Sequence, residues 1–424
     1  MSAATGPAGG GDRIARRVHH VWLLIHRWVG LAMALFLIIE GVTGAMLAFR
    51  GPLTEFFDPG LYSQPPAPSV QQLDLAALIE IAEKREPRGV FHWFLPMGEG
   101  VALIYMKPRH DPATGKPADL GFGYLALDPW TGREVRRMDE GLYTAGAGML
   151  PNVMPFVYEL HKVLALGDFG AWVLGITALL WTLDCFAGVY LTFPLTLNRF
   201  WQRWKPAWLI KWRARWPRIN LDIHRSFSLW QWLALFIFAW SSVALIDKLA
   251  VYDNVTTSLF GSGPEFVPTP AAAKKIGPPK MNWHEAYAYG MAQANDIGKR
   301  EGFVVGEPNG FWYDDENGVY TLRVDTSRRF PHERYRILAF DGDTGASVPP
   351  PGAADGNLNM LVTDYLIAFH MIGDPFDYEA FRWYVVVFGV ALTAISVTGV
   401  VIWLFKRSGL RTHSARGGLH VPRG

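Results

Sequence analysis

Four apolar stretches of about 20 residues or more constrain this chain more than any other feature of its sequence. They cover residues 28–49, 169–195, 227–252 and 383–405, and they contain few charged side chains. A bilayer core of ~30 Å requires ~20 helical residues, and lipid cannot satisfy the hydrogen bonds of an exposed backbone. The sequence therefore predicts a membrane protein with a bundle of four transmembrane helices.

Basic residues are concentrated in three of the segments that flank these stretches. They crowd the N-terminus, the loop between the second and third stretches, and the C-terminal tail, whereas the two long segments also carry many acids. Short basic segments resist translocation, so we expect a multi-pass membrane protein with both termini cytoplasmic and the two long segments outside. The basic residues are Arg13, Arg16, Arg17, Arg199, Arg203, Lys205, Lys211, Arg213, Arg215, Arg218, Lys406, Arg407, Arg411, Arg416 and Arg423.

The first apolar stretch is longer than the ~7–15 residues of a signal-peptide core, so it is expected to remain as an uncleaved anchor. Cys185, the single cysteine, lies within the second stretch. It has no partner for an intramolecular disulfide, and one thiolate cannot hold an iron–sulfur cluster that needs several.

Splitting the chain near residue 200 gives two halves with the same order of parts, which predicts an internal duplication. Each half has a His-Arg pair, a span, a segment of roughly 100 residues typical of one small domain, a further His and a second span. Gly188-Val189 and Gly399-Val400 stand at matching places in the second and fourth stretches. The expected parts are a cytoplasmic N-terminus (1–20), helix 1 (21–49), periplasmic domain 1 (50–160), a ligand His with helix 2 (161–195), a cytoplasmic Trp/Arg-rich interfacial loop (196–222), helix 3 (223–252), periplasmic domain 2 (253–369), a ligand His with helix 4 (370–405) and a cytoplasmic tail (406–424).

Each periplasmic domain is expected to be α+β, with one helix packed on a small antiparallel sheet. Residues 73–85 and 283–300 have helical periodicity, and residues 102–106 and 319–324 alternate as strands do. An Asp-x-x-Thr-Gly motif occurs in both domains, ending at Gly132 and Gly345. Asp can accept hydrogen bonds from the following amides, and Gly can adopt positive φ, so the motif predicts a hairpin turn without a chemical role.

Four of the twelve histidines lie at helix ends, one for each predicted span. The topology places His26 and His224 at the cytoplasmic level, and His161 and His370 at the periplasmic level. Two imidazoles from different helices at one depth suit the axial positions of a six-coordinate haem iron. The sequence therefore predicts two non-covalent b-type haems, ligated by His26/His224 and His161/His370.

Small residues follow the two cytoplasmic histidines on the same helical face. Positions 4 and 18 residues later are Gly30 and Gly44 after His26, and Ser228 and Ser242 after His224. They would let a flat cofactor lie against the helix backbone. Arg27 and Arg225, next to these histidines, could neutralise haem propionates or could equally extend to lipid phosphates.

Other residues leave alternatives open. His19 is the main rival to His26, being seven residues earlier on the same face, and His20 is less well placed. Glu40 and Asp184 are acids within spans; Glu40 could accept a proton coupled to reduction or could bond a hydroxyl on a neighbouring helix. The sequences at 167–170 and 373–375 could interrupt the helix after each periplasmic ligand. The remaining histidines of the large segments are expected to be ordinary surface or strand residues, namely His92, His110, His284 and His332.

Five tryptophans between the second and third spans recur every three or four residues among Lys and Arg. This pattern predicts a helix in the headgroup plane that contacts membrane lipid, with a docking face for an electron donor as the alternative. They are Trp201, Trp204, Trp208, Trp212 and Trp216. The chain has no Gly-x-Gly-x-x-Gly after a strand and no phosphate-binding loop, so electrons must come from a quinol or a separate flavoprotein. No nucleic-acid partner is expected.

The sequence resembles the PepSY-associated transmembrane family, and within it the siderophore-iron reductases of Gram-negative inner membranes. The matching residues are 26–31 (His-Arg-Trp-Val-Gly-Leu), Thr43-Gly44, Leu160-His161-Lys162, the two Asp-x-x-Thr-Gly turns and Thr398-Gly399. The resemblance implies periplasmic PepSY-like domains, haem in the four-helix bundle, and reduction of a ferric siderophore to release Fe(II) for iron uptake. Two other interpretations remain: a haem-free PepSY binding or inhibitory module, and a di-haem protein that reduces a periplasmic protein or copper.

Overall fold

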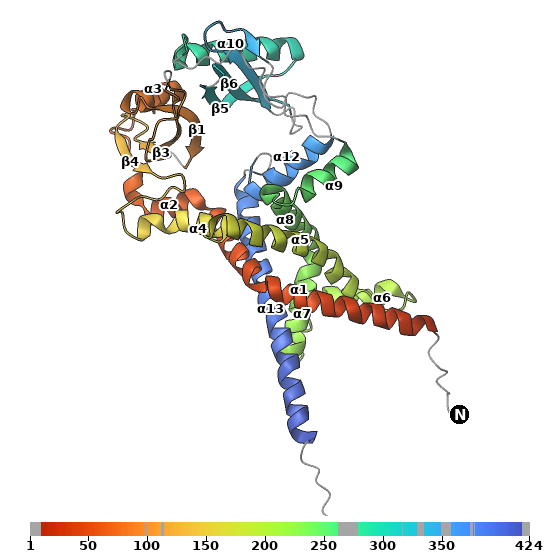
Figure 1. Cartoon of the computed structure of the whole chain (residues 1–424). Helices are drawn as coiled ribbons and strands as arrows, with labels where there is room; N and C mark the ends of the chain where they lie inside the picture. Colours follow the sequence, from red (N-terminus) through yellow and green to blue (C-terminus); the bar gives the residue numbers. More distant parts are fainter. Residues whose placement is uncertain are drawn as a thin grey trace, which may run out of the picture. The chain divides into compact units, whose positions relative to one another are not determined.

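A computed structural model describes residues 10–97, 100–111, 114–261, 279–315, 317–328, 335–348, 358–373, 376 and 378–417. The chain divides into two compact units, each described here by itself. The first unit comprises Met1–Ala48, Leu160–Asp253 and Phe369–Gly424, and the second comprises Phe49–Glu159 and Asn254–Ala368. The first unit contains the apolar helices, and the second contains the sheets (Figure 1).

Three helices of the first unit are long and apolar enough to cross a membrane: α1 (Gly10–Leu47), α5 (Gly167–Thr192) and α13 (Glu379–Gly417). A fourth span results if α7 (Trp216–Trp230) and α8 (Trp232–Ile246) are counted together. These two helices meet at Gln231 with a bend of 69°. The prediction of one continuous third helix is therefore wrong. Gln231 has φ −101° and ψ 7°, and its side-chain oxygen accepts a hydrogen bond from Tyr384 of α13 at 3.2 Å.

The helices of this unit are held together by close packing around α1 and α13. α1 packs against α13 and α5, α5 packs against α8, and α7 packs against α13. At the crossing of α1 and α13, Gly41 and Gly389 face each other so closely that a Cβ on Gly41 would lie 2.7 Å from the carbonyl oxygen of Gly389. Small residues at such crossings let two backbones approach in lipid, where helix association relies on packing.

Two shorter helices precede the second and last spans. α4 (Val153–Val163) ends before Leu164 and Ala165, which have positive φ, and α5 then begins at Gly167. α12 (Leu358–Met371) ends before Ile372, which also has positive φ, and α13 begins at Glu379. The helix is thus interrupted after His161 and after His370. The first break lies at residues 164–166 and not at the predicted 167–170, which are helical in α5, whereas the second includes Gly373. Asp374 and Pro375, named in that prediction, lie outside the described residues.

The Trp-rich loop does not form the single helix that its spacing predicted. It forms α6 (Phe200–Trp204) and a 3₁₀ turn η3 (Lys205–Trp208), and residues 209–215 are not helical. Pro206 is the second residue of the 3₁₀ turn, and Pro217 is the second residue of α7. Proline tolerates the first turn of a helix and prevents its N-terminal continuation, which explains the breaks. Trp201, Trp212 and Trp216 remain exposed.

The second unit contains two α+β regions with the same order of elements. The first has α3 (Leu75–Arg85), β1 (Gly89–Pro96), β2 (Ala102–Pro108), β3 (Tyr124–Leu127) and β4 (Glu134–Met138). The second has α10 (Trp283–Glu301), β5 (Val305–Asp314), β6 (Val319–Thr326), β7 (Tyr335–Asp341) and β8 (Ser347–Val348). Each sheet is an antiparallel meander in sequence order. Short helices complete the unit: α2 (Arg50–Phe57), η1 (Pro59–Leu61), η2 (Leu150–Asn152) and α9 (Val251–Phe260), which overlaps the boundary.

The local structure of these regions agrees with the sequence patterns. Asp74 caps α3, and Asn282 with Glu285 forms a capping box on α10. In the two Asp-x-x-Thr-Gly turns the Asp accepts hydrogen bonds from the amides two and three residues later, and the Gly has φ of 66° at Gly132 and 71° at Gly345. The predicted hairpin turns are confirmed.

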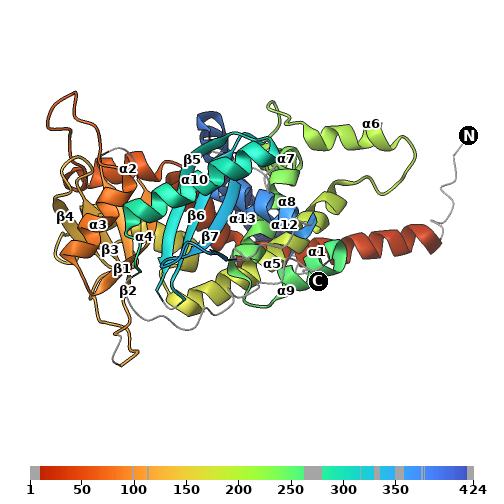
Figure 2. The ribbon, with the colours of Figure 1, turned by 90° about the horizontal axis from the view of Figure 1, so that it is seen from above.

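One hydrophobic core joins both α+β regions. Trp283 of α10 is buried between Phe91 of β1 and Phe311 of β5, with ring centres 5.3 Å and 5.1 Å away. Figure 2 shows α10 lying across strands β5 to β7, and its buried face contacts all three. The two regions therefore share a core and form a single folding unit.

Candidate functional site

The four helix-end histidines meet in two pairs inside the first unit. His26 of α1 faces His224 of α7, with ring centroids 6.2 Å apart and planes inclined by 57°. His161 of α4 faces His370 of α12, with centroids 6.3 Å apart and the same inclination. Each pair combines one histidine from each half of the chain, in the combinations expected from the sequence.

Every one of the four imidazoles has its Nδ1 hydrogen-bonded. In the first pair, His26 Nδ1 lies 2.9 Å from both carboxylate oxygens of Asp184, and His224 Nδ1 lies 2.9 Å from the carbonyl oxygen of Ile395. A carbonyl oxygen can only accept, so His224 carries its proton on Nδ1. Its Nε2 then carries a lone pair, as the nitrogen of a metal-ligating imidazole must.

The second pair has equivalent bonds to hydroxyl groups. His161 Nδ1 lies 2.9 Å from Thr43 Oγ1, and His370 Nδ1 lies 2.7 Å from Ser241 Oγ. Both hydroxyls donate to carbonyls of their own helices, so they accept from the imidazoles. Glu40 Oε2 also lies near His161 Nδ1, at 3.0 Å. The Nε2 atoms of this pair are again left free for ligation.

The separation within each pair fits one metal ion between the rings. A metal–imidazole bond of ~2.0 Å, with ~1.1 Å more from nitrogen to ring centre, puts two rings on opposite sides of one metal about 6.2 Å apart. The observed 6.2 Å and 6.3 Å agree. Among the described residues, no group of three or more His, Cys, Asp and Glu could hold a metal. A metal between two such imidazoles would take its other ligands from a non-protein group, as the four nitrogens of haem would supply.

A cavity beside the first pair provides room for such a group. Its volume is about 280 Å³, whereas ~10–15 Å³ by the same measure holds one water. Both imidazoles line it, together with Gly30 of α1 and Ser228 of α7. A Cβ added at Gly30 would meet no atom within 4 Å, so the helix surface is open there.

Two arginines at the cavity have buried donor atoms without partners among the described residues. Arg27 and Arg225 line it, and the Nε atom of each is buried without a hydrogen-bond partner among the described residues. Arg225 also donates to Asp222 and to the carbonyl oxygen of Pro206. Buried donors without partners are rare in proteins. A carboxylate such as a haem propionate would satisfy both, so the residues present fit haem at this level.

Glycines accommodate the imidazoles themselves. A Cβ at Gly44 would lie 3.2 Å from His161, and one at Gly399 would lie 3.2 Å from His224. Gly188 is placed similarly, with its added Cβ 3.6 Å from His26. Gly44, which was predicted to let a flat cofactor lie against the helix, lies against the His161 ring. The hydroxyl of Ser242 donates to the carbonyl of Phe238, and it is the neighbouring Ser241 that bonds His370.

The two pairs are separated along α1 by a distance comparable to a membrane. Gly44, which touches His161, follows His26 by 18 residues, or ~27 Å of helix. The hydrocarbon core of a bilayer is ~30 Å thick. The pairs therefore stand near opposite ends of the apolar helices.

The rival histidines are located elsewhere. His19 packs beside Tyr190 with ring centroids 6.1 Å apart, and His20 is exposed. In the second unit, His284 bonds Glu80 and His110 bonds Asp315, while His92 packs beside Tyr105. His332 lies outside the described residues.

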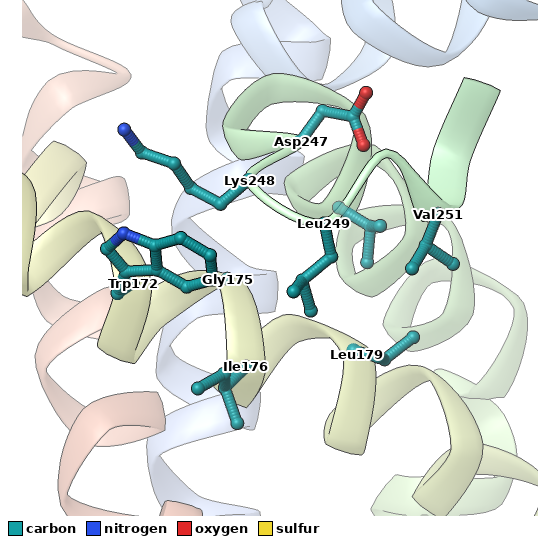
Figure 3. Close-up of a pocket in the computed structure, with 9 residues that line it drawn as sticks. Trp172, Gly175, Ile176, Leu179, Asp247, Lys248, Leu249 and Val251 are labelled. Carbon is teal, nitrogen blue, oxygen red and sulfur yellow. The ribbon is translucent and has the colours of Figure 1, made fainter. Parts of the chain in front are cut away.

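A second cavity in the first unit is too small for a cofactor. It has a volume of about 10 Å³, which suits one water. Figure 3 shows its lining by Trp172, Ile176 and Leu179 of α5 and by the segment from Asp247 to Val251. The large cavity beside His26 and His224 is thus the better cofactor site.

Four residues that bond the imidazoles were not predicted in that role. They are Asp184, Glu40, Thr43 and Ser241. The only available signal for the acids was their rarity within apolar spans. Ser241 follows His224 by 17 residues, as Thr43 follows His26, so the repeat could have identified both hydroxyls.

Comparison with known families gives one match. A family model described as the PepSY-associated TM region matches residues 23–406, which is most of the chain and includes all four paired histidines. A comparison with curated proteins gives no match.

Proposed function

The chain belongs to the family of PepSY-associated transmembrane regions, and from that premise we propose that it is a di-haem b-type reductase of a bacterial inner membrane. The observation that carries the proposal is the pairing of four imidazoles at metal-bridging distance, with every Nδ1 hydrogen-bonded, so that Nε2 is the nitrogen available for ligation. Among the described residues, no third His, Cys, Asp or Glu joins either pair to form a metal site made of side chains alone.

In this proposal, His26 and His224 hold the inner haem, and His161 and His370 hold the outer one. When bound, each haem supplies a one-electron Fe(III)/Fe(II) couple. Arg27 and Arg225 neutralise propionates, and Gly30 and Ser228 keep the helix faces open beside the inner pair. The chain's own residues thus act by binding and orienting the cofactor.

The physiological acceptor is proposed to be a ferric siderophore on the periplasmic side. One electron converts Fe(III) to Fe(II), whose lower charge weakens its attraction to hard oxygen ligands, so the chelate releases its metal for iron uptake. The donor is a quinol or a cytoplasmic flavoprotein. This chemistry needs no nucleophile or general base from the protein.

The orientation and the repeat support this arrangement. The loop between α5 and α7 is rich in Lys and Arg, and such loops favour the cytoplasmic side. This supports a cytoplasmic position for His26 and His224 and a periplasmic one for the second unit with its PepSY-like α+β regions. Equivalent residues in the two halves make equivalent bonds, as Thr43 and Ser241 do. An internal duplication accounts for both sites at once.

Absorption spectroscopy of the purified full-length protein tests the central claim. We expect sharp b-type bands after reduction with dithionite. Colourless protein from haem-replete cells would contradict the proposal and favour a haem-free binding or inhibitory module.

Single-histidine variants test the pairing. His161→Ala is expected to remove about half of the bound haem, because the outer site loses an axial ligand while His26 and His224 remain. His20→Ala, at an exposed histidine on α1, is the matched control and should retain all haem. Loss of both haems from the His161→Ala variant, with the helices intact, would refute two independent sites.

The acceptor is tested by mixing reduced protein with ferric siderophores and timing haem reoxidation. Rapid reoxidation, with Fe(II) captured by a ferrous chelator, is the expected result. Reoxidation only by a copper salt or by a periplasmic protein would retain the haems and change the substrate.

A further inference from the structure

The two imidazoles of each pair have different kinds of hydrogen-bond partner. His26 is bonded by the carboxylate of Asp184, whereas its opposite ligand His224 is bonded by a main-chain carbonyl. His161 has the carboxylate of Glu40 at 3.0 Å in addition to Thr43, whereas His370 is bonded by the neutral Ser241. Each site therefore has one imidazole beside a negative charge and one beside neutral groups.

This difference is imposed on a scaffold that otherwise repeats. Glu40 stands three residues before Thr43, and the equivalent position three residues before Ser241 is Phe238. Asp184 stands four residues before Gly188, and the equivalent position four residues before Gly399 is Ile395. The hydroxyls and glycines occur in both halves, while the acids occur only in the first. The carboxylates are therefore additions to the repeated site rather than part of its common framework.

Both acids are largely removed from solvent. The side chain of Asp184 is 11% exposed and that of Glu40 is 18% exposed. Burial of a carboxylate among apolar helices is unfavourable unless a partner offsets the loss of water. In each case the nearest partner is the imidazole, and Glu40 Oε1 has no hydrogen-bond partner among the described residues. Within the part of the chain that the structure describes, neither acid forms an ion pair with Lys or Arg.

A buried negative charge beside a ligand acts on the iron through the bond network and through space. Ferric haem with two neutral imidazoles carries one net positive charge, and the ferrous form carries none. In a low-dielectric interior, a nearby carboxylate stabilises the charged form over the neutral form. Hydrogen bonding of Nδ1–H to a carboxylate also raises the basicity of the ligating nitrogen, which favours the ferric state further.

We propose that Asp184 and Glu40 are positioning residues that lower the reduction potentials of the inner and outer sites, each acting through its own histidine. The inference rests on the proposed di-haem function. It assigns to each site one carboxylate that matches the single positive charge of the oxidised state. A low potential makes the reduced form a stronger one-electron donor, which suits an acceptor that is difficult to reduce.

Redox titration of the full-length detergent-solubilised protein, with both haems followed by absorption, tests the inference. Asp184→Asn and Glu40→Gln keep an oxygen acceptor but remove the charge. Each is expected to raise the ferrous-to-ferric ratio at a fixed potential by about tenfold or more, which is ~59 mV per tenfold for one electron. The shift should be confined to the inner site for Asp184→Asn and to the outer site for Glu40→Gln.

Two matched variants separate charge from structure. Asp184→Glu retains the charge and should stay close to the original potential. Asp168→Asn removes an acid from the same helix, at a side chain that is 74% exposed and paired with Lys248, and should move neither potential. If the Asp184→Asn variant does not retain its haem, the Ile395→Asp variant tests the inner site instead. A second carboxylate beside His224 should lower the reduction potential of that site.

The outcomes distinguish the inference from the function on which it rests. Wild-type protein without b-type bands would refute the di-haem function itself. Full haem content with unchanged potentials in Asp184→Asn and Glu40→Gln would overturn the inference and leave the function intact. A potential that stays the same or rises in Ile395→Asp would also overturn it.

Discussion

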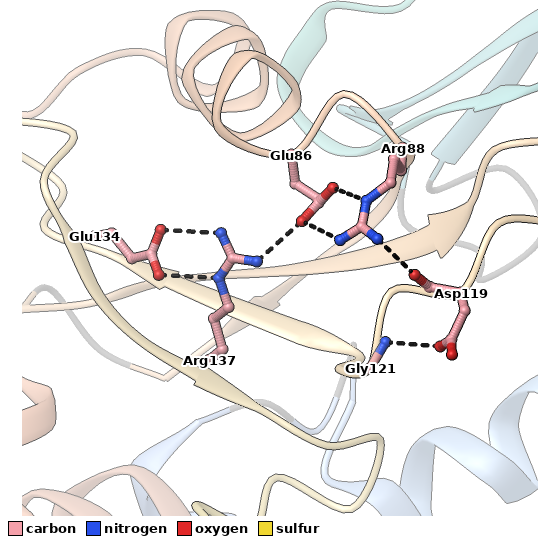
Figure 4. A network of polar contacts seen from close by, with 6 residues as sticks. All are labelled: Glu86, Arg88, Asp119, Gly121, Glu134 and Arg137. Carbon is pink, nitrogen blue, oxygen red and sulfur yellow. Dashed lines mark hydrogen bonds and ion pairs between the residues drawn. The ribbon is translucent and has the colours of Figure 1, made fainter.

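Glu86 shows how single charged residues fix the outer surface of the first α+β region. It closes the C-terminus of α3 and accepts hydrogen bonds from Arg88 at 2.8 Å and 3.1 Å and from Arg137 at 2.9 Å (Figure 4). Arg137 in turn donates to Glu134 of the same strand. The side chain of Glu86 is 7% exposed. Hydrogen bonds from Arg88, and to a smaller extent from Arg137, lower the pKa of Glu86 from 4.5 to about 2.

This pKa shift predicts a dependence of stability on pH. A carboxylate with a lowered folded-state pKa stabilises the fold at pH values above its unfolded pKa, and that contribution is lost as pH falls from 4.5 toward about 2. The pKa shift limits the contribution of Glu86 to the free energy of unfolding to ~3 kcal/mol. Solvent around the exposed Arg88 weakens the interaction, so we expect a contribution of about 1–2 kcal/mol at pH 7. Glu86→Gln should therefore lower the free energy of unfolding at pH 7, and the difference should shrink at pH 3.

The effect is measured at both pH values by urea unfolding of the solubilised protein, with the protease susceptibility of the second unit as the readout. Glu55→Gln, at an exposed acid of α2, is the control and should change little. A deficit of Glu86→Gln that is equally large at pH 3 and pH 7 would contradict the electrostatic explanation.

At the same residue scale, the sequence indicates the ligands better than their partners. His26, His161, His224 and His370 were predictable because the repeat and the depth of each helix end restrict the pairings. Asp184 could not be assigned to His26, because that contact depends on the rotation of α5 about its axis. Apolar residues occupy both buried and exposed positions of α5, so its sequence does not indicate which face of the helix points toward α1.

At the scale of helices and strands, local chemistry determined what was predictable. The capped helices and the Asp-x-x-Thr-Gly turns follow from side chains close in sequence. The proline positions 206 and 217 were visible signals for the breaks in the Trp-rich loop, and they outweigh its helical spacing. The bend between α7 and α8 has no such signal, because Gln231 is neither Pro nor Gly and its bond to Tyr384 is a tertiary contact.

The crossing of α1 and α13 leads to a prediction for one glycine. Gly389→Val places a branched side chain against the backbone of α1 at Gly41, so the helices must separate. Glu40 adjoins this crossing, and we expect the variant to lose its outer haem at a temperature several degrees lower, as for a destabilisation of a few kcal/mol. Loss of the b-type bands during heating is the measurement.

Val390→Leu is the matched control for that variant. Val390 is 63% exposed on the adjacent position of α13, so a larger side chain there meets no neighbouring helix. Equal heat sensitivity of the two variants would show that close approach of the backbones at Gly389 has no special role.

At the scale of the whole molecule, the asymmetric distribution of charge predicts its orientation. We expect Lys116, exposed in the second unit, to face the periplasm, and Arg203, exposed in the Trp-rich loop, to face the cytoplasm. In a Cys185→Ala background, a membrane-impermeant maleimide should label Lys116→Cys in intact spheroplasts. Arg203→Cys should become labelled only after the membrane is permeabilised.

Labelling of Arg203→Cys in sealed spheroplasts would invert the topology and exchange the inner and outer sites. The background change is suitable because Cys185 is the single cysteine of the chain and is buried.

The alternation of ligands between the halves also has a consequence for biosynthesis. A nascent chain that ends near residue 200 holds one imidazole of each pair and completes neither. The inner pair first exists when His224 has been made, and its wall at Gly399 follows only with α13. The outer pair requires His370, so both imidazoles of that pair are available to a prosthetic group only after the second α+β region has been translated.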